Sequence, residues 1–370
     1  MKTRLIISIA ALQLLSLINV FACTTFVLKD SNQIVYGRSF DFNFGTGYIV
    51  NNQRGIEKYG YVHEANPITW TSKYGSITFN QFGKEFPYGG MNEKGLVVAQ
   101  MFLGKTRYPD ADNRKAINEL QWIQYQLDVS STVEEVLASD TVVRISNIMS
   151  VGIHFQVCDS KGNKATIEFL GGKMVCHTGE DLPIPLLTNN TYDESITYLK
   201  QFDVMGGEKT IPYKNIEDIE WTNDNVLVVN KVFTTAANTM VNGSDSAGLV
   251  NKAFDVLKSV TIRNHTKWST VFDVTNNMIY FKNESRKEII SLDFNAFDYA
   301  PGQKSIILDI QTATADNVMN QFKDYSFEIN KEYVFKAFVP MMESGFIPAV
   351  LPDEVIEAHA RFPETLKRAE

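Results

Sequence analysis

Cys23, Arg38 and Asp41 are the residues of this chain whose types and spacing suggest covalent chemistry. A cysteine attacks carbonyl carbons as its thiolate, and a neighbouring cation raises the thiolate fraction because it lowers the thiol pKa. In a hairpin with a two-residue turn at positions 30 and 31, Arg38 lies directly opposite Cys23. The alternative interpretation is an edge strand that merely begins at Cys23, with Arg38 and Asp41 as a surface ion pair.

The segment before Cys23 has the layout of a secretory signal peptide. Two cations, Lys2 and Arg4, precede an apolar run, and the small residue Ala22 stands directly before Cys23. The run is shorter than the roughly 20 residues that a membrane-spanning helix needs, and polar side chains interrupt it. We therefore expect cleavage of residues 1–22, a secreted or periplasmic protein without stable membrane insertion, and Cys23 as the new N-terminal residue.

A cysteine at the N-terminus of a chain carries its own base. An α-amine has a reference pKa of about 8, so it can take the thiol proton at neutral pH and later give it to a leaving amine. Asp41 follows Arg38 by only three residues. That position is close enough to orient the amine of Cys23 by a charge-assisted hydrogen bond.

The composition argues against several classes of partner. The formal net charge is −8 and no cluster of Lys or Arg stands out, so neither nucleic acid nor an anionic membrane is expected as a partner. Three cysteines are too few for a disulfide scaffold, and Cys158 and Cys176 are either a pair or, more simply, two small buried hydrophobes. The sequence has no Cys/His metal spacing, phosphate loop or dinucleotide loop, so no cofactor is expected.

Strands and helices alternate in blocks along the chain, which predicts an α+β fold with antiparallel sheets. Short β-rich runs dominate the first half, from CTTFVL at 23–28 to KMVCH at 173–177. Helical periodicity predicts helices at 116–127, 132–138, 192–202, 226–236 and 246–260. We expect one large domain over residues 23–324. Residues 325–370, which end in a helix from Pro352 to about Lys367, form a C-terminal extension packed on that domain or trailing it.

Four segments resemble successive signatures of the choloylglycine hydrolase and penicillin V acylase family of N-terminal nucleophile (Ntn) hydrolases: CTTFVL with YGRSFDF, GGMNEKGLVVAQ, LLTNNTY and TKWSTVFDVTNNMIYF. The resemblance implies a four-layer αββα sandwich with two antiparallel sheets. It also implies hydrolysis of a linear, non-peptide amide C–N bond through a thioester, without a cofactor. By position, Cys23 matches the nucleophile, Arg38 the arginine beside it, and Asp41 the aspartate that holds the amino group. Asn189 matches the asparagine of the oxyanion hole, although a plain turn role also suits it.

Two positions depart from the family pattern. Phe102 stands where bile salt hydrolases have Asn and penicillin V acylases have Tyr, which alters a side-chain contact to substrate and leaves its backbone N–H for the oxyanion hole. Val232 stands where the family often has an arginine. The resemblance therefore implies a small-molecule N-acyl substrate, such as a conjugated bile salt, penicillin V or an N-acyl amine or amino acid, without selecting one. Because tetramers are common among relatives, it also leaves a homo-oligomer open.

An aromatic-rich stretch is either the lining of an apolar acyl pocket or ordinary core. Its residues are Trp70, Tyr74, Phe79, Phe82, Phe86 and Tyr88, with Met101 and Phe102 further on.

Two other functions fit parts of the sequence. Residues 20–23 loosely resemble a lipobox, and lipidation of Cys23 would consume the thiol and leave a tethered binding protein. The departures at Phe102 and Val232 would also suit an inactive Ntn fold that only binds a ligand.

Overall fold

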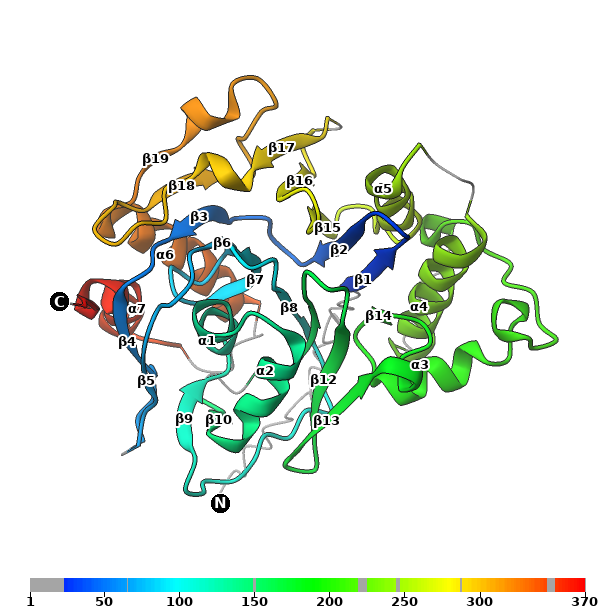
Figure 1. The fold of residues 1–370 in the computed structure, drawn as a ribbon, viewed down its shortest axis with the longest axis horizontal. Coiled ribbons are helices and arrows are strands. Elements are labelled where there is room, and N and C mark those ends of the chain that lie inside the picture. The colour runs from blue at the N-terminus through cyan, green and yellow to red at the C-terminus, as the bar shows by residue number, and fades with distance from the viewer. Residues whose placement is uncertain are drawn as a thin grey trace, which may run out of the picture.

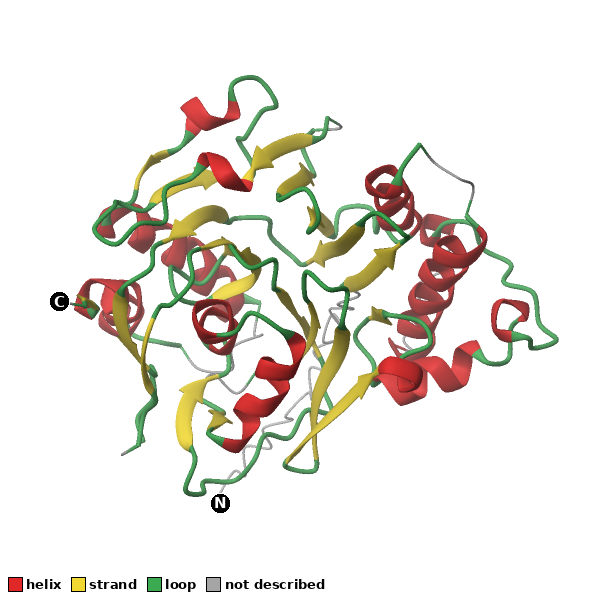
Figure 2. Cartoon of the chain, in the orientation of Figure 1, coloured by secondary structure: helices red, strands yellow, loops and turns green. Residues whose placement is uncertain are grey.

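A computed structural model describes residues 23–64, 66–148, 151–218, 225–243, 247–286, 288–344 and 350–369. The predicted signal peptide, residues 1–22, lies outside these ranges. Strands fill the middle of the molecule and helices lie on either side of them (Figure 1, Figure 2). Within the described ranges, no helix is long and apolar enough to cross a membrane.

The sheet next to Cys23 is antiparallel and has six strands in the order β14-β1-β2-β15-β16-β17. The strands are Thr24–Lys29 (β1), Ile34–Asp41 (β2), Leu186–Leu187 (β14), Thr266–Asp273 (β15), Met278–Asn283 (β16) and Ile290–Asp293 (β17). All eight residues of β2 are buried, since both faces of the sheet are covered. Cys23, directly before β1, therefore lies inside the molecule.

The second sheet has nine antiparallel strands in the order β13-β12-β11-β8-β7-β6-β3-β18-β19. They are Tyr48–Asn52 (β3), Ser76–Asn80 (β6), Pro87–Asn92 (β7), Val97–Phe102 (β8), Ile153–Cys158 (β11), Lys164–Leu170 (β12), Lys173–Thr178 (β13), Ile306–Asp309 (β18) and Lys323–Asp324 (β19). The two sheets face each other: the Tyr36 hydroxyl donates to the carbonyl of Gln156, and the Phe79 ring meets the edges of Phe272 and Phe281.

Helices complete the sandwich on both sides. On the six-stranded sheet lie Tyr192–Leu199 (α3), Asn225–Asn242 (α4) and Leu249–Ser259 (α5), with α5 in contact with β1, β2 and β15. Trp122–Val129 (α1) contacts β7 and β8 of the other sheet and is followed by Val133–Ala138 (α2), where the Thr132 hydroxyl caps the helix by accepting from the Glu135 amide. The layers confirm the predicted αββα arrangement with two antiparallel sheets.

The hairpin register predicted for β1 and β2 is wrong by two residues. Arg38 pairs with Thr25, not with Cys23, because the turn contains residues 30–33 instead of two residues. The Asp30 carboxylate holds this wider turn by accepting from the amides of Asn32 and Gln33. A shift by two residues keeps every side chain on its face, so Arg38 and Cys23 still lie on the same side of the sheet.

The predicted helix at 116–127 is wrong in its first turn. Lys115–Asn118 form a strand (β9) that pairs in parallel with Val143–Ser146 (β10). The Asn118 side chain accepts from the Leu120 amide, an Asx turn that reverses the chain before α1 begins.

Residues 325–344 and 350–369 pack on the sandwich. They contain Phe327–Glu343 (α6), which the sequence analysis missed, and Asp353–Arg361 (α7), which ends earlier than the predicted Lys367. Lys367–Arg368 (β20) then pair with Ile56–Tyr59 (β4), whose other neighbour is Thr69–Thr71 (β5).

Candidate active site

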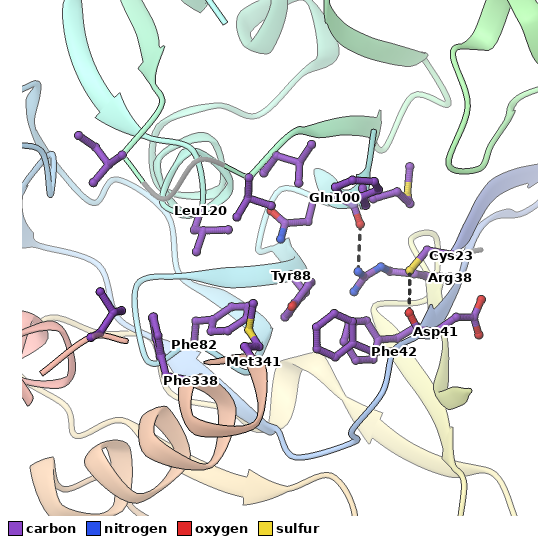
Figure 3. A pocket seen from close by; sticks show the side chains of 17 residues that line it. Cys23, Arg38, Asp41, Phe42, Phe82, Tyr88, Gln100, Leu120, Phe338 and Met341 are labelled. Carbon is purple, nitrogen blue, oxygen red and sulfur yellow. Dashed lines mark hydrogen bonds between the residues drawn. The ribbon is translucent and has the colours of Figure 1, made fainter. Parts of the chain in front are cut away.

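A cavity of about 160 Å³ lies beside the Cys23 thiol, and its two ends differ in character (Figure 3). Cys23, Arg38 and Asp41 lie at one end, and Phe82, Phe338 and Met341 lie at the other. The lining consists of Cys23, Arg38, Phe40, Asp41, Phe42, Phe82, Tyr88, Gln100, Met101, Phe102, Leu120, Ile148, Val151, Ile153, Phe338, Met341 and Leu351. We call these parts the thiol end and the far end.

The Cys23 thiol is 6% exposed and donates to the backbone carbonyl of Asp41 at 3.6 Å. Burial, with a smaller contribution from the Asp41 carboxylate, raises the pKa of Cys23 to about 12. Arg38 lowers this pKa, as expected, but burial outweighs it. The thiol therefore needs a base or a further cation at hand before it can act as a nucleophile at neutral pH.

Arg38 connects the two sheets at the thiol end. Its Nη2 donates to the carbonyl oxygen of Gln100 on β8 at 3.0 Å (Figure 3). The guanidinium carbon lies 5.5 Å from the ring centre of Phe40 and 5.4 Å from that of Tyr88, a cation–π arrangement. Burial lowers the pKa of Arg38, while Cys23 and Tyr36 oppose this shift. A guanidinium nevertheless stays protonated in proteins, so Arg38 is a fixed positive charge beside the thiol.

Asp41 is a buried carboxylate that accepts from two hydroxyls. Ser39 Oγ lies 2.8 Å from each carboxylate oxygen, and Thr266 Oγ1 on β15 is a further donor. Burial nevertheless raises the pKa of Asp41 to about 7, against the opposing effects of Thr266, Ser39 and Arg38. A cation placed beside this carboxylate would lower its pKa again, and that makes Asp41 a suitable partner for an ammonium group.

Asn189 follows β14, the strand that pairs with β1. Leu187 of β14 pairs with Thr25 in an antiparallel register. Continued for two more residues beyond β14, this register places Asn189 opposite Cys23. Its Nδ2 donates to the carbonyl oxygen of Phe102 at 2.7 Å. An amide nitrogen carries two hydrogens, and the bond to Phe102 uses one of them. Of the five predicted site residues, Cys23, Arg38, Asp41 and Phe102 thus line the cavity, and Asn189 contacts Phe102.

The loop that carries Asn189 is anchored by a buried carboxylate that the sequence analysis missed. Glu168 on β12 accepts from the Tyr192 amide, at the start of α3, at 3.1 Å. The Nδ1 of His154 on β11 lies 3.1 Å from the same carboxylate. The sequence signal is a Glu and a His in otherwise apolar strands, since such groups are rarely buried without a partner.

The aromatic stretch divides between cavity and core. Phe82, Tyr88, Met101 and Phe102 line the cavity, whereas Trp70, Tyr74, Phe79 and Phe86 are buried elsewhere in the described core.

The structure also shows where Val232 and the two other cysteines lie. Val232, aligned with a family arginine, is buried in α4, and the neighbouring Lys231 lies over the Tyr213 ring. Cys158 is buried and Cys176 is exposed, and both are free thiols, so the expected burial is wrong for Cys176. Among the described side chains, no group of three or more His, Cys, Asp or Glu is arranged to hold a metal ion.

Comparisons with known proteins agree with this architecture. Penicillin V acylase of Pectobacterium atrosepticum is 25% identical over 344 residues, covering 82% of this chain and 89% of that protein. The structure of penicillin V acylase from Agrobacterium tumefaciens is similar with a TM-score of 0.66 and 25% identity, covering 82% of this chain and 98% of that one. A variant of the conjugated bile acid hydrolase from Clostridium perfringens shares the fold, with a TM-score of 0.58, 18% identity and coverage of 82% and 96%. Residues 23–307 match the family of linear amide C–N hydrolases called the choloylglycine hydrolase family, and this chain belongs to it.

Proposed function

We propose that this protein is a secreted or periplasmic cysteine amidase that hydrolyses N-acyl amides with a small apolar acyl group. Removal of residues 1–22 frees the amine of Cys23 and activates the enzyme. The observation that carries the proposal is the thiol end of the cavity. There Cys23, Arg38 and Asp41 line one cavity, and Asn189 donates to the carbonyl of Phe102, another lining residue.

The proposed reaction has two steps, formation of a thioester and its hydrolysis. The free amine of Cys23 takes the thiol proton, and the thiolate attacks the acyl carbonyl carbon, forming a C–S bond. Arg38 stabilises the thiolate, and Asp41 holds the resulting ammonium group. The tetrahedral oxyanion accepts from the second amide hydrogen of Asn189. The C–N bond then breaks, and the ammonium proton goes to the leaving amine.

Water completes the cycle. The amine of Cys23 takes a proton from a water molecule, which attacks the thioester carbonyl. The C–S bond breaks, and the carboxylic acid leaves with the free thiol restored. Each proton that the α-amine accepts in one step is returned in the next.

The size of the cavity supports a small acyl group. An apolar protein cavity of about 150 Å³ holds one benzene ring, and the volume here is about 160 Å³. This space suits a single ring, as in the acyl group of penicillin V, or a short alkyl chain. It is too small for the four fused rings of a bile acid without rearrangement.

Hydrolysis of penicillin V, glycocholate and short N-acyl glycines by the mature protein tests the proposal. We expect the single-ring and short-chain amides to be substrates, with kcat lowered by about 10⁶-fold in Cys23→Ala, as for other enzymes that lose their nucleophile. Cys176→Ala, which removes an exposed thiol, is the control and is expected to keep full activity. If none of the amides is hydrolysed, the amidase proposal fails.

Mass spectrometry of the exported protein tests the activation step. We expect a chain that begins with an unmodified Cys23. A diacylglyceryl adduct on that residue would instead support the tethered lipoprotein, because it would consume the nucleophile.

A further inference from the structure

We propose that the C-terminal segment formed by α6 and Leu351 sets the length of the acyl chain that this enzyme accepts. The inference rests on the proposed function, because it concerns the acyl half of the same substrate. Three apolar side chains of the segment, Phe338, Met341 and Leu351, line the cavity. An acyl group bonded to Cys23 and extending along the cavity would end against them.

The position of these residues makes them a wall at the far end. In Figure 3 the thiol and Arg38 lie at one side of the cavity, and Phe338 and Met341 lie at the opposite side, next to Phe82. The Phe338 ring meets the Phe82 ring edge-on, with 5.4 Å between their centres. Phe338 and Met341 are 1% and 3% exposed, so they are packed inside the molecule and are not a loose surface flap.

The wall belongs to the part of the chain beyond the family match, which ends at residue 307. The match includes the residues of the thiol end, from Cys23 to Asn189. The chemistry is therefore built by the shared portion of the chain, and the length limit is built by the following portion. Relatives that differ after the match are expected to differ in the acyl group that they accept.

The wall is fixed in place, as a length limit requires. Asn330 on α6 accepts from the Tyr48 hydroxyl at 2.7 Å and donates to the carbonyl of Ala360 on α7 at 2.7 Å. His359 on α7 lies 2.7 Å from the carbonyl oxygen of Phe82 and meets the Phe338 ring edge-on. A rigid apolar wall discriminates by about 10–200-fold for one methylene group.

Met341 is the best residue for a test, because its unbranched side chain can be shortened at the wall. The substrates are p-nitroanilides with straight acyl chains of increasing length, so the leaving group stays constant while the acyl group changes. We expect kcat/KM of the wild type to rise to an optimum and then fall by at least about 10-fold for each additional carbon. Met341→Ala removes three heavy atoms, and we expect the optimum to move by about two or three carbons toward longer chains.

Matched variants control for general effects of truncation. Met319→Ala makes the same chemical change at a half-buried methionine of the segment Val318–Gln321, and it is expected to leave the optimum in place. Phe338→Ala, at the wall, is expected to move the optimum toward longer acyl chains. Phe335→Ala, at a half-buried position of the same helix, is expected to leave it in place. If Met341→Ala does not fold, Met341→Leu is nearly isosteric and is expected to give a smaller shift of about one carbon.

A binding measurement separates failure of this inference from failure of the proposed function. Fatty acids of increasing length are titrated into the mature Cys23→Ala protein, and their binding is measured by calorimetry. This measurement shows which chain length the cavity binds most tightly, without any hydrolysis. We expect the length of the tightest-binding acid to shift in Met341→Ala as the kinetic optimum does. If the optimum stays where it is in both Met341→Ala and Phe338→Ala, the wall does not set the length. If fatty acids shift but no amide is hydrolysed, only the amidase proposal fails.

Discussion

The two ends of the cavity are built in opposite ways. At the thiol end, polar groups from neighbouring strands are held by hydrogen bonds, such as the bond from Arg38 to the Gln100 carbonyl and those from Ser39 to Asp41. At the far end, the side chains that face the cavity are apolar and come from distant parts of the sequence, such as Phe82 and Phe338, whose rings pack against each other. Losing one donor at the thiol end should abolish a step of the chemistry. Losing one contact at the far end should only change which acyl group fits.

Apart from loss of the nucleophile, the largest effect on chemistry is expected at Asn189. Asn189→Ala removes the proposed oxyanion donor and should lower kcat by about 10²–10³-fold, with little change in KM, because the donor acts in the transition state. Steady-state kinetics with the best short-chain amide measure both constants. Asn189→Asp keeps the shape of the side chain but has no N–H to donate, so it should lose as much activity.

The free energy of unfolding of the Asn189 variants is the control for a general loss of structure. The side chain makes one hydrogen bond, to Phe102, and its loss should lower the free energy of unfolding by only about 1 kcal/mol. Activity within 10-fold of the wild type in both Asn189 variants would exclude Asn189 from the oxyanion hole.

The thiol end was largely predictable because its parts are local in sequence. Cys23, Arg38 and Asp41 belong to one hairpin, and alternation places Arg38 on the same face as Cys23. Asp41 is three residues further along, so its side chain takes the opposite face, next to Ser39. The register was mispredicted, since the width of a turn depends on hydrogen bonds such as those to Asp30. The error did not separate Arg38 from Cys23, because a shift by an even number of residues preserves the face.

The far end was not predicted, although the buried residues of α6, from Asn330 to Met341, recur at helical spacing. No local pattern shows which distant residues this helix contacts. Residues 325–370 were expected only as an extension that ends in a helix, whereas α6 has buried residues such as Tyr333 and Phe338. Asn330, a polar residue, is also fully buried on this helix. Its burial depends on partners such as Tyr48, far away along the chain. Tertiary pairing of this kind leaves no periodic signal.

A second prediction uses the pH dependence of stability to detect the proposed contact between Asp41 and the amine. The comparison is between the mature chain and a chain with one alanine added before Cys23, which has no amine at that position. In the chain with residues 1–22 before Cys23, burial raises the pKa of Asp41 from 3.8 to about 7, and we expect the same direction in the extended chain. The folded state then binds a proton more tightly than the unfolded state, so the contribution of Asp41 to stability is present below about pH 4 and is lost as the pH rises through about 7.

Asp41→Asn isolates this contribution, because it removes the titrating group. In the extended chain, the free energy of unfolding of Asp41→Asn relative to its parent should increase as the pH rises from about 4 to 7. In the mature chain the increase should be smaller, because the ammonium group of Cys23 stabilises the carboxylate. Urea unfolding at several pH values measures the difference. Equal pH dependence in the two chains would mean that Asp41 does not hold the amine.

The activity of the Asp41→Asn variant tests the role of Asp41 independently of stability. A misplaced base should lower kcat/KM of the mature Asp41→Asn variant by about 10²-fold. The loss should affect all acyl chain lengths equally, in contrast to variants at Met341.

The smallest effect on chemistry is expected from Asn330, which lies behind the far end. Asn330→Ala leaves the Tyr48 hydroxyl and the Lys84 amide without their acceptor and the Ala360 carbonyl without its donor. We expect the free energy of unfolding to fall by about 3 kcal/mol, because buried polar groups left unpaired cost about 1–3 kcal/mol each and partly rearrange. Asn320→Ala, at an exposed position, should change it by less than about 0.5 kcal/mol.

The kinetic result for Asn330→Ala separates positioning of the wall from chemistry. The kcat for the shortest acyl amides should stay within about twofold of the wild type, because the side chain has no partner among the groups that act on the carbonyl. Discrimination between acyl lengths should weaken, because a wall that is no longer anchored yields to longer chains. A loss of kcat as large as that of Asn189→Ala would mean that the two ends are coupled, and the division between a catalytic end and a selective end would then be wrong.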